Sequence, residues 1–182
     1  MTGAGPFCWG ESAARMIGDG TEPANPYAPN KVKGGEIFTM IETNGSWFFD
    51  TASYCLDASC HSTSCGVTAA GDIYCWDATS WRASPLVLLP VTGAPKVKSV
   101  SVGMDHVCAI DLDNRLWCWG SSRYEQTGVL QFGDASPHRV APDLFFQQVS
   151  AGRGHTCAID FSGDLSGALI SLTPSTLKIS TE

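Results

Sequence analysis

The stretch Ser99–Cys118, SVSVGMDHVCAIDLDNRLWC, recurs along this chain and decides its fold. A second copy is Leu56–Cys75, LDASCHSTSCGVTAAGDIYC, and a third, partial copy is Gln148–Gly167, QVSAGRGHTCAIDFSGDLSG. The copies begin at residues 56, 99 and 148 and are therefore 43 and 49 residues apart. A period of about 40 to 50 residues is typical of propellers and solenoids, whose units bury their apolar faces only against their neighbours.

Short antiparallel strands are the elements that the repeat predicts. In the middle copy, Val100–Val102 ends at Gly103, Val107–Asp111 is a second strand, and Arg115–Trp119 is a third. Glu36–Ile41 is a candidate for a fourth strand. The 19 Gly and 10 Pro residues divide the chain into short elements, which favours β structure over long helices.

A three-residue turn joins the second and third strands of each copy. Pairing Cys108 with Cys118 sets Asp111 opposite Arg115, with Leu112–Asn114 between them. The last residue of such a turn usually adopts the left-handed conformation, which favours Gly and then Asn. That position holds Gly71, Asn114 and Gly163 in the three copies.

The same register predicts two disulfides. It places Cys65 opposite Cys75, just as it places Cys108 opposite Cys118. Opposed residues at a non-hydrogen-bonded antiparallel site have β-carbons about 4.5–5.5 Å apart, close to the separation that a disulfide needs. Four buried free thiols are the alternative interpretation.

The remaining cysteines leave more than one interpretation open. Cys55 and Cys60 form a candidate local pair, and together with His61 and the Cys65–Cys75 pair they permit a zinc interpretation. Their gaps do not match the paired CxxC spacing of structural zinc sites, and the middle copy keeps its two cysteines without the extra ones. We therefore expect neither a metal nor a cofactor.

Composition and charge exclude several classes of function. The formal charge of −7 and the scattered basic residues argue against a nucleic-acid surface. No apolar stretch reaches the length of about 18 residues that a membrane-spanning helix needs. Eight cysteines indicate an oxidising compartment, although the start, MTGAGPFCWG, lacks the basic and apolar parts of a secretory signal.

The repeat resembles the regulator of chromosome condensation repeat. Gly103, His106 and Trp119-Gly120 carry the likeness in the middle copy, and Gly152 and His155 carry it in the third. The cysteine-bearing form is similar to repeats of secreted bacterial proteins and of Crinkly-type plant receptor ectodomains. The resemblance implies a seven-bladed β-propeller with four-stranded blades. We therefore expect an all-β fold, a partial β-propeller of antiparallel blades with about three to four repeat units.

The domain organisation follows from the repeat boundaries. We expect one repeat domain over 1–182, and the three copies are too few for a closed ring, so we expect part of a longer propeller. Cys8 and Cys157 hold repeat positions whose partner half is missing from this segment. Cys157 pairs either with a residue outside the segment or with Cys8 itself, and we expect the outside partner. The predicted parts are a repeat tail 8–35, repeats 36–87 and 96–140, a partial repeat 147–167 and a divergent tail 168–182.

Candidate sites have a structural and a functional interpretation. His106 and His155 recur at one repeat position, and Trp9, Trp76 and Trp119 at another, which favours packing roles over catalysis. Asp111 and Asp113 echo a calcium loop, but no Glu closes it. The sequence shows no nucleophile set, so we expect no enzyme. Loop aromatic residues are the candidates for partner contact: Tyr27, Tyr124 and Phe132.

Two functions remain open at the level of sequence. The first is a non-enzymatic scaffold, extracellular or at the cell surface, that binds a protein or glycan partner through its loops. The alternative, which the founding member of the family implies, is a nucleus- or cytoplasm-located exchange factor for a small GTPase. No residue of this chain matches an exchange motif, and cysteine pairing and acidic charge favour the scaffold.

Overall fold

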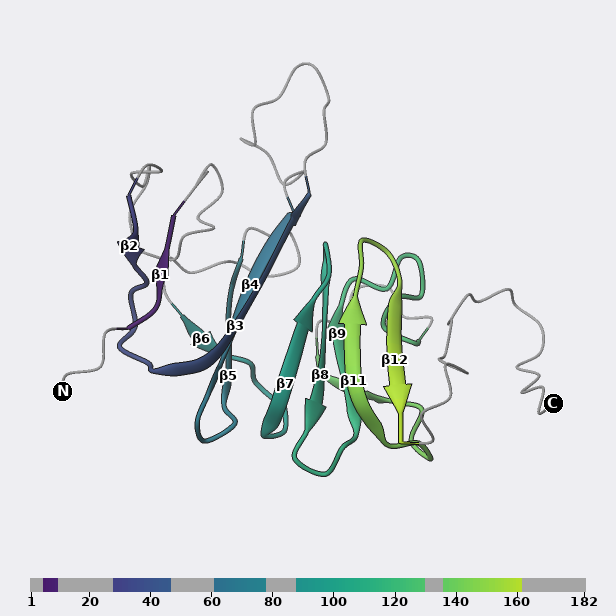
Figure 1. Cartoon of the computed structure of the whole chain (residues 1–182). Coiled ribbons are helices and arrows are strands. Elements are labelled where there is room, and N and C mark those ends of the chain that lie inside the picture. The colour runs from purple at the N-terminus through teal and green to yellow at the C-terminus, as the bar shows by residue number, and fades with distance from the viewer. Residues whose placement is uncertain (1–4, 10–27, 47–60, 78–87, 130–135, 162–182) are drawn as a thin grey trace, which may run out of the picture.

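Four antiparallel sheets lie side by side in the computed structural model, which describes residues 5–9, 28–46, 61–77, 88–129 and 136–161 (Figure 1). The described residues form strands and turns only, so the expected all-β class is confirmed. No helix within these ranges has the length and apolarity that a membrane crossing needs.

The two central sheets each contain four strands that are neighbours in sequence. The first has the order β3-β4-β5-β6, and the second has the order β10-β9-β8-β7. Their bounds are β3 Phe38–Ser46, β4 His61–Thr68, β5 Ile73–Asp77 and β6 Leu89–Pro90, followed by β7 Val97–Val102, β8 His106–Asp111, β9 Leu116–Gly120 and β10 His138–Val140.

Two-stranded sheets flank the central pair on either side. The N-terminal one pairs β1 (Phe7–Cys8) with β2 (Asn30–Lys31), and the C-terminal one pairs β11 (Phe146–Ala151) with β12 (Thr156–Asp160). In the repeat, β1 and β2 correspond to the last two strands of a sheet, whereas β11 and β12 correspond to the first two. The described chain therefore holds two full sheets between two half sheets.

The predicted hairpin register is present in both central sheets. Cys65 lies opposite Cys75, and Cys108 lies opposite Cys118. The turn residues Gly71 and Asn114 have φ values of 80° and 66°, in the left-handed region. The third predicted turn residue, Gly163, lies outside the described residues.

The interpretation of Glu36–Ile41 as a fourth strand is wrong. That segment contributes to β3, which begins at Phe38 and is the first strand of its sheet. Gly66 on β4 allows this pairing, because a β-carbon there would lie 2.7 Å from the ring of Phe38. The first strand of this unit thus precedes the Leu56–Cys75 copy instead of lying at the start of it.

Apolar side chains fill the space between successive sheets. Every residue of β8 is buried, because alternate side chains enter the interfaces on its two faces. Val107 and Ala109 pack toward the β3–β6 sheet, whereas Cys108 and Ile110 pack toward β11 and β12. A smaller cluster of Val32, Trp76 and Leu88 joins the N-terminal pair to the β3–β6 sheet.

Candidate functional site

Segments 103–105, 121–129 and 152–155 gather at one end of the sheets, which we call the loop end (Figure 1). They follow β7, β9 and β11. In the β7–β10 sheet, β7 and β9 each pair antiparallel with β8, so β7 and β9 run in the same direction. The segments that follow these two strands therefore lie at the same end of the sheet. The loop end is therefore built from two neighbouring sheets.

A glycine and a histidine close the turn that follows β7. The Gly103 amide donates to the His106 carbonyl at 2.8 Å, and a β-carbon on Gly103 would lie 2.2 Å from Cε1 of the His106 ring. The turn after β11 repeats this arrangement with Gly152 and His155, whose amide and carbonyl are 2.9 Å apart. The recurring Gly and His of the repeat are therefore a packing pair.

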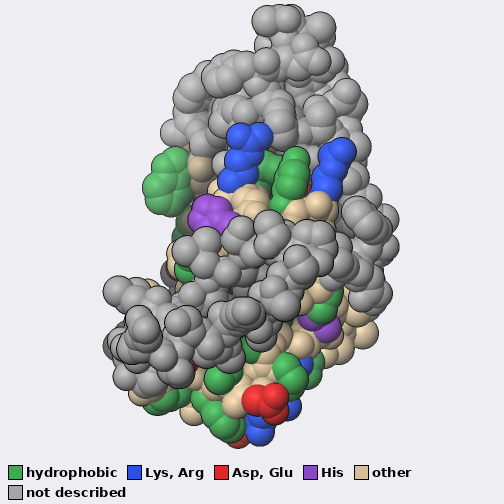
Figure 2. Space-filling model, turned by 90° about the vertical axis from the view of Figure 1, so that its right-hand side faces the viewer, with side chains coloured by type: hydrophobic (Ala, Val, Ile, Leu, Met, Phe, Trp, Pro, Cys, Tyr) green, Lys and Arg blue, Asp and Glu red, His purple; other side chains and the backbone are tan. Residues whose placement is uncertain are grey.

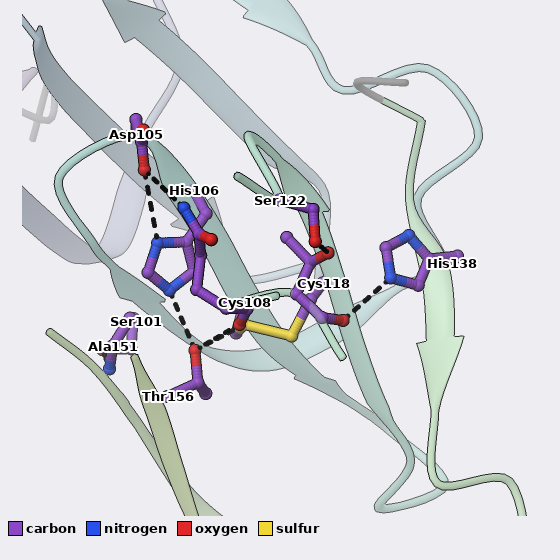
Figure 3. Close-up of a disulfide and its surroundings, with 11 residues drawn as sticks. Ser101, Asp105, His106, Cys108, Cys118, Ser122, His138, Ala151 and Thr156 are labelled. Carbon is purple, nitrogen blue, oxygen red and sulfur yellow. Dashed lines mark hydrogen bonds and ion pairs between the residues drawn. A yellow bond between two sulfur atoms is a disulfide. The ribbon is translucent and has the colours of Figure 1, made fainter. Parts of the chain in front are cut away.

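His106 also starts a buried hydrogen-bond network between the two sheets. Its Nε2 is 2.8 Å from the hydroxyl of Thr156 on β12, and that hydroxyl donates to the Gln126 carbonyl at 2.8 Å. The Gln126 side chain in turn donates to Asp105 at 2.9 Å. Figure 3 shows His106 between Asp105 and Thr156, beside the Cys108–Cys118 disulfide.

The single hydroxyl hydrogen of Thr156 determines which atom is the donor in the hydrogen bond between His106 and Thr156. A threonine hydroxyl has one hydrogen, and here it goes to the Gln126 carbonyl, so Nε2 of His106 must be the donor to Thr156. The Nδ1 atom then faces Asp105 at 3.9 Å, beyond hydrogen-bond distance.

Asp105 is buried and carries an altered pKa. Burial acts to raise the pKa of its carboxyl, but the neighbouring polar groups, among them the Gln126 amide that donates to it at 2.9 Å, outweigh burial and hold the pKa below its ordinary value. The carboxylate is therefore ionised and serves as the buried acceptor that anchors Gln126.

The set Thr156, His106 and Asp105 has the residue types of a hydrolytic triad but not its chemistry. His106 is 0% exposed. The Thr156 hydroxyl donates its hydrogen bond to the backbone carbonyl of Gln126 and not to the imidazole. A triad needs the base to accept the nucleophile's proton and an orienting carboxylate within hydrogen-bond reach. The network of Asp105, His106, Gln126 and Thr156 therefore has a structural role, and we call it the brace.

This brace fixes the segment that carries Tyr124. The Tyr124 amide donates to the Gln126 side chain at 2.7 Å, and Glu125 adopts a φ of 62° to make the turn. The Tyr124 ring is 62% exposed, and it lies against Gly154, where a β-carbon would be 3.2 Å from the ring. An aromatic side chain is thus presented to solvent on a rigid base.

The predicted cysteine pairs are disulfides in the structure. Cys65 and Cys75 have α-carbons 4.1 Å apart, as do Cys108 and Cys118, and all four side chains are buried. Each pair lies on the face of its sheet that meets the following sheet. Oxidation of these cysteines in protein from its native source stays a prediction.

Several other predicted residues fall outside the described ranges. Cys55 and Cys60, together with the loop aromatics Tyr27 and Phe132, belong to this group, so Tyr124 is the candidate contact residue that the structure places. Within the described ranges, no group of His, Cys, Asp and Glu could hold a metal ion. Cys8 is half-buried, Cys157 is exposed, and both are free thiols.

The packing role expected of the three repeat tryptophans holds for two of them. Trp76 and Trp119 are 2% and 0% exposed, and each contacts the preceding sheet. The expectation is wrong for Trp9, which is 65% exposed. Trp9 follows β1, and the described residues contain no sheet before β1 for its ring to pack against.

Asp111 has a structural role in the turn 112–114, where the sequence is similar to a calcium-binding loop. Its Oδ1 accepts the amides of Asp113 and Arg115 at 2.9 and 2.8 Å, and its Oδ2 accepts Nε1 of Trp117 at 2.9 Å. The carboxylate is therefore fully engaged in shaping the hairpin.

Sequence reasoning did not identify the basic residues of the loop end. Arg123 and Arg153 are exposed beside Tyr124 and Gly154. Neither belongs to the repeat pattern, and only the stacking of two sheets brings them to one surface.

Comparison with known proteins shows which repeat family and which folds this chain is similar to. Residues 97–126 and 113–159 match two family models, each described as the Regulator of chromosome condensation (RCC1) repeat. The ultraviolet-B receptor UVR8 of Arabidopsis thaliana is 32% identical over 82 residues, which cover 42% of this chain and 18% of that protein. These findings confirm the resemblance to the RCC1 repeat family.

Solved structures agree with this result. Human WBSCR16 matches with a TM-score of 0.67 and 16% identity, covering 88% of this chain and 41% of that one. Prp20p from Saccharomyces cerevisiae, described with its binding to Gsp1p and histones, matches with a TM-score of 0.62 and 16% identity, covering 85% and 40%. The chain is therefore a partial β-propeller of antiparallel blades, and it spans about two fifths of the structures that it matches.

Proposed function

We propose that this chain is part of a non-catalytic propeller scaffold that binds a protein or glycan partner outside the cell, through its loop end. The observation that carries the proposal is the braced turn at Tyr124, where buried Gln126 and Asp105 hold an exposed aromatic ring in place. Rigid, exposed aromatic side chains are common anchors of protein interfaces. Pre-ordering the turn lowers the entropy that binding costs.

A scaffold without catalysis is supported by the chemistry of the loop end. His106 lies beside a hydroxyl and a carboxylate at this end, but its side chain is fully buried. Its Nε2 is hydrogen-bonded to Thr156, and its Nδ1 has no hydrogen-bond partner. A catalytic base must reach the proton that it abstracts from the substrate. The residue types at this end suit recognition better than reaction.

The extracellular part of the proposal rests on the two cysteine pairs. Both occupy the same repeat position, and each joins adjacent strands within its sheet. Disulfides persist in oxidising compartments and are rare in the cytosol and nucleus.

A second candidate function is nucleotide exchange on a small GTPase. The likeness to Prp20p, which was described for its binding to Gsp1p, favours it. Fold likeness alone does not transfer an activity, because function depends on the site.

Affinity capture tests the two functions against each other. The chain is immobilised in oxidised form and exposed to extracellular fluid and to nuclear extract, and bound proteins and glycoproteins are identified. Saturable capture from extracellular fluid, lost with Tyr124→Ala, is the expected result. Capture of a small GTPase, with faster release of its bound nucleotide, would overturn the scaffold proposal.

A further inference from the structure

The two half sheets of this chain are complementary parts of one four-stranded sheet. In the β7–β10 sheet, Cys108 on the second strand lies opposite Ser101 on the first. In the C-terminal half sheet, Cys157 on β12 lies opposite Ser150 on β11. The β11–β12 pair therefore holds the first two strands of the repeat in the register of a full sheet.

The N-terminal half sheet holds the other two strands. In the β7–β10 sheet, Cys118 on the third strand lies opposite His138 on the fourth. Cys8 on β1 lies opposite Asn30 on β2 in the same way. If β1 lies antiparallel to β12 with Cys8 opposite Cys157, the four strands reproduce the order and register of the β7–β10 sheet.

Cys8 and Cys157 are both available for such a pairing. Each is a free thiol, and among the described strands β12 pairs with β11 alone and β1 pairs with β2 alone. Residues 158–182 contain no cysteine, so the sequence after β12 holds no hairpin partner for Cys157. Strands with one unpaired edge are templates for pairing with a further strand.

Among the described residues, the Trp9 ring lacks the neighbouring sheet that its repeat equivalents pack against. Trp76 and Trp119 are 2% and 0% exposed against the preceding sheet, whereas Trp9 is 65% exposed. In the completed sheet, β1 follows the β7–β10 sheet, which already packs against β11 and β12. Trp9 then lies over the β7–β10 sheet as Trp119 lies over the β3–β6 sheet, and its ring is buried.

The completed sheet also has a neighbour on its other face. Figure 2 looks onto the side of the molecule where β11 and β12 lie, and hydrophobic side chains are visible on the described part of it. The β1–β2 pair already packs against its own β3–β6 sheet, through Val32 and Cys8. That sheet covers the exposed side chain of Cys157 in the completed arrangement, as β11 and β12 cover Cys108.

The two half sheets of one chain cannot form this sheet together, because they lie at opposite ends of the series with two full sheets between them (Figure 1). We propose that two copies of this chain associate head to tail. The β1–β2 pair of one copy completes the β11–β12 pair of the other, and a disulfide joins Cys8 of the first to Cys157 of the second. Such a contact joins different surfaces of two identical chains. The proposal goes beyond the scaffold function and does not depend on what the loop end binds.

The disulfide forms by exchange with a small-molecule disulfide such as oxidised glutathione. One protein thiolate attacks the small disulfide and releases one thiol, and the second protein thiolate displaces the other. One S–S bond of the reagent breaks and one bond between Cys8 and Cys157 forms. The two electrons that the cysteines lose, and their two protons, are carried by the two thiols that leave.

Two variants that each keep one of these thiols test the proposal. Cys8→Ser keeps Cys157, and Cys157→Ser keeps Cys8. Each variant alone and an equimolar mixture are incubated in reduced and oxidised glutathione, and the products are identified by mass and by peptide mapping without reduction. The expected product of the mixture is a dimer linked through Cys8 and Cys157, absent from either variant alone. Cys157 is exposed and free, so its loss leaves the unfolding of the separate chain unchanged.

Several outcomes would overturn the proposal. They are a mixture that stays monomeric, linked dimers in equal yield from one variant alone, and an internal bond between Cys8 and Cys157 in the monomeric wild-type chain. In protein from its native source, a bond from either cysteine to another cysteine of one longer chain would also overturn it.

Trp9 supplies a second readout, because its burial must accompany the pairing of β1 with β12. Trp9→Ser, added to the variant that keeps Cys8, is expected to slow formation of the linked dimer. Leu112→Ser in the same variant is the control, since Leu112 is 60% exposed in a turn of the β7–β10 sheet, away from β1 and β2. Equal rates with and without Trp9→Ser would contradict the proposed packing.

Discussion

The ring of His106 lies so close to Gly103 that a β-carbon on Gly103 would be 2.2 Å from Cε1 and 2.7 Å from the Gly152 carbonyl oxygen of the next sheet. The contact explains why the repeat sets a glycine three residues before its histidine. The glycine makes room for the ring, and the ring reaches the neighbouring sheet through Thr156.

Substituting this glycine tests the packing pair. Gly103→Ala is expected to cost about 1–3 kcal/mol of unfolding free energy, because a backbone oxygen and a buried ring must both move. Urea unfolding measures the change. In the control Gly5→Ala, the new methyl group meets the flexible end of Lys31, so an unfolding midpoint near that of wild type is expected. Equal midpoints for Gly103→Ala and wild type would contradict the account.

The Cys108–Cys118 pair is expected to stabilise the fold. C108A/C118A should lower the unfolding free energy by about 2–3 kcal/mol, since the bond closes a short loop of separation 10. Cys157→Ala, at an exposed free cysteine, is the control and should change little. Peptide mapping without reduction reports the pairing in native material. Free thiols at both pairs would reject the disulfides and the extracellular proposal together.

The His106–Thr156 hydrogen bond is expected to couple the two sheets. Thr156→Val should cost about 1–3 kcal/mol, because it leaves the buried Nε2–H of His106 unpaired. The same change in a His106→Phe background should cost less, and a double-mutant cycle measures the difference. Strictly additive effects would show that the two side chains do not interact.

Asp105 gives the stability a defined dependence on pH. Its folded pKa lies below the ordinary value of 3.8, so its contribution is present above about that pH and is lost as the pH falls through the folded pKa. Asp105→Asn should therefore flatten the acid limb of the stability profile. Thermal unfolding between neutral and acid pH measures it, and an unchanged acid limb would mean that Asp105 does not contribute.

The sequence predicts the parts of the fold that short-range geometry controls. Two cysteines ten residues apart, with Gly71 or Asn114 at the end of the turn, are enough to set a hairpin register. The position of β3 could not be predicted, because segment 47–60 separates it from the strand that it pairs with.

The brace beneath Tyr124 depends on contacts between residues that are distant in sequence. His106 and Thr156 are 50 residues apart, and they meet only after two sheets have stacked. In the preceding sheet the equivalent pair is Thr63 and Val107, which cannot form the same bond, and the Thr63 hydroxyl has no described partner. The repeat pattern alone therefore predicts the histidine but not its role.

The most direct test of the account is the footprint of the captured partner on the chain. Hydrogen exchange of the oxidised chain, with and without that partner, locates the protected amides. The account predicts protection in segments 121–129 and 152–155 at the loop end. Protection confined to the opposite end, at the turn 112–114 and segment 141–145, would contradict it.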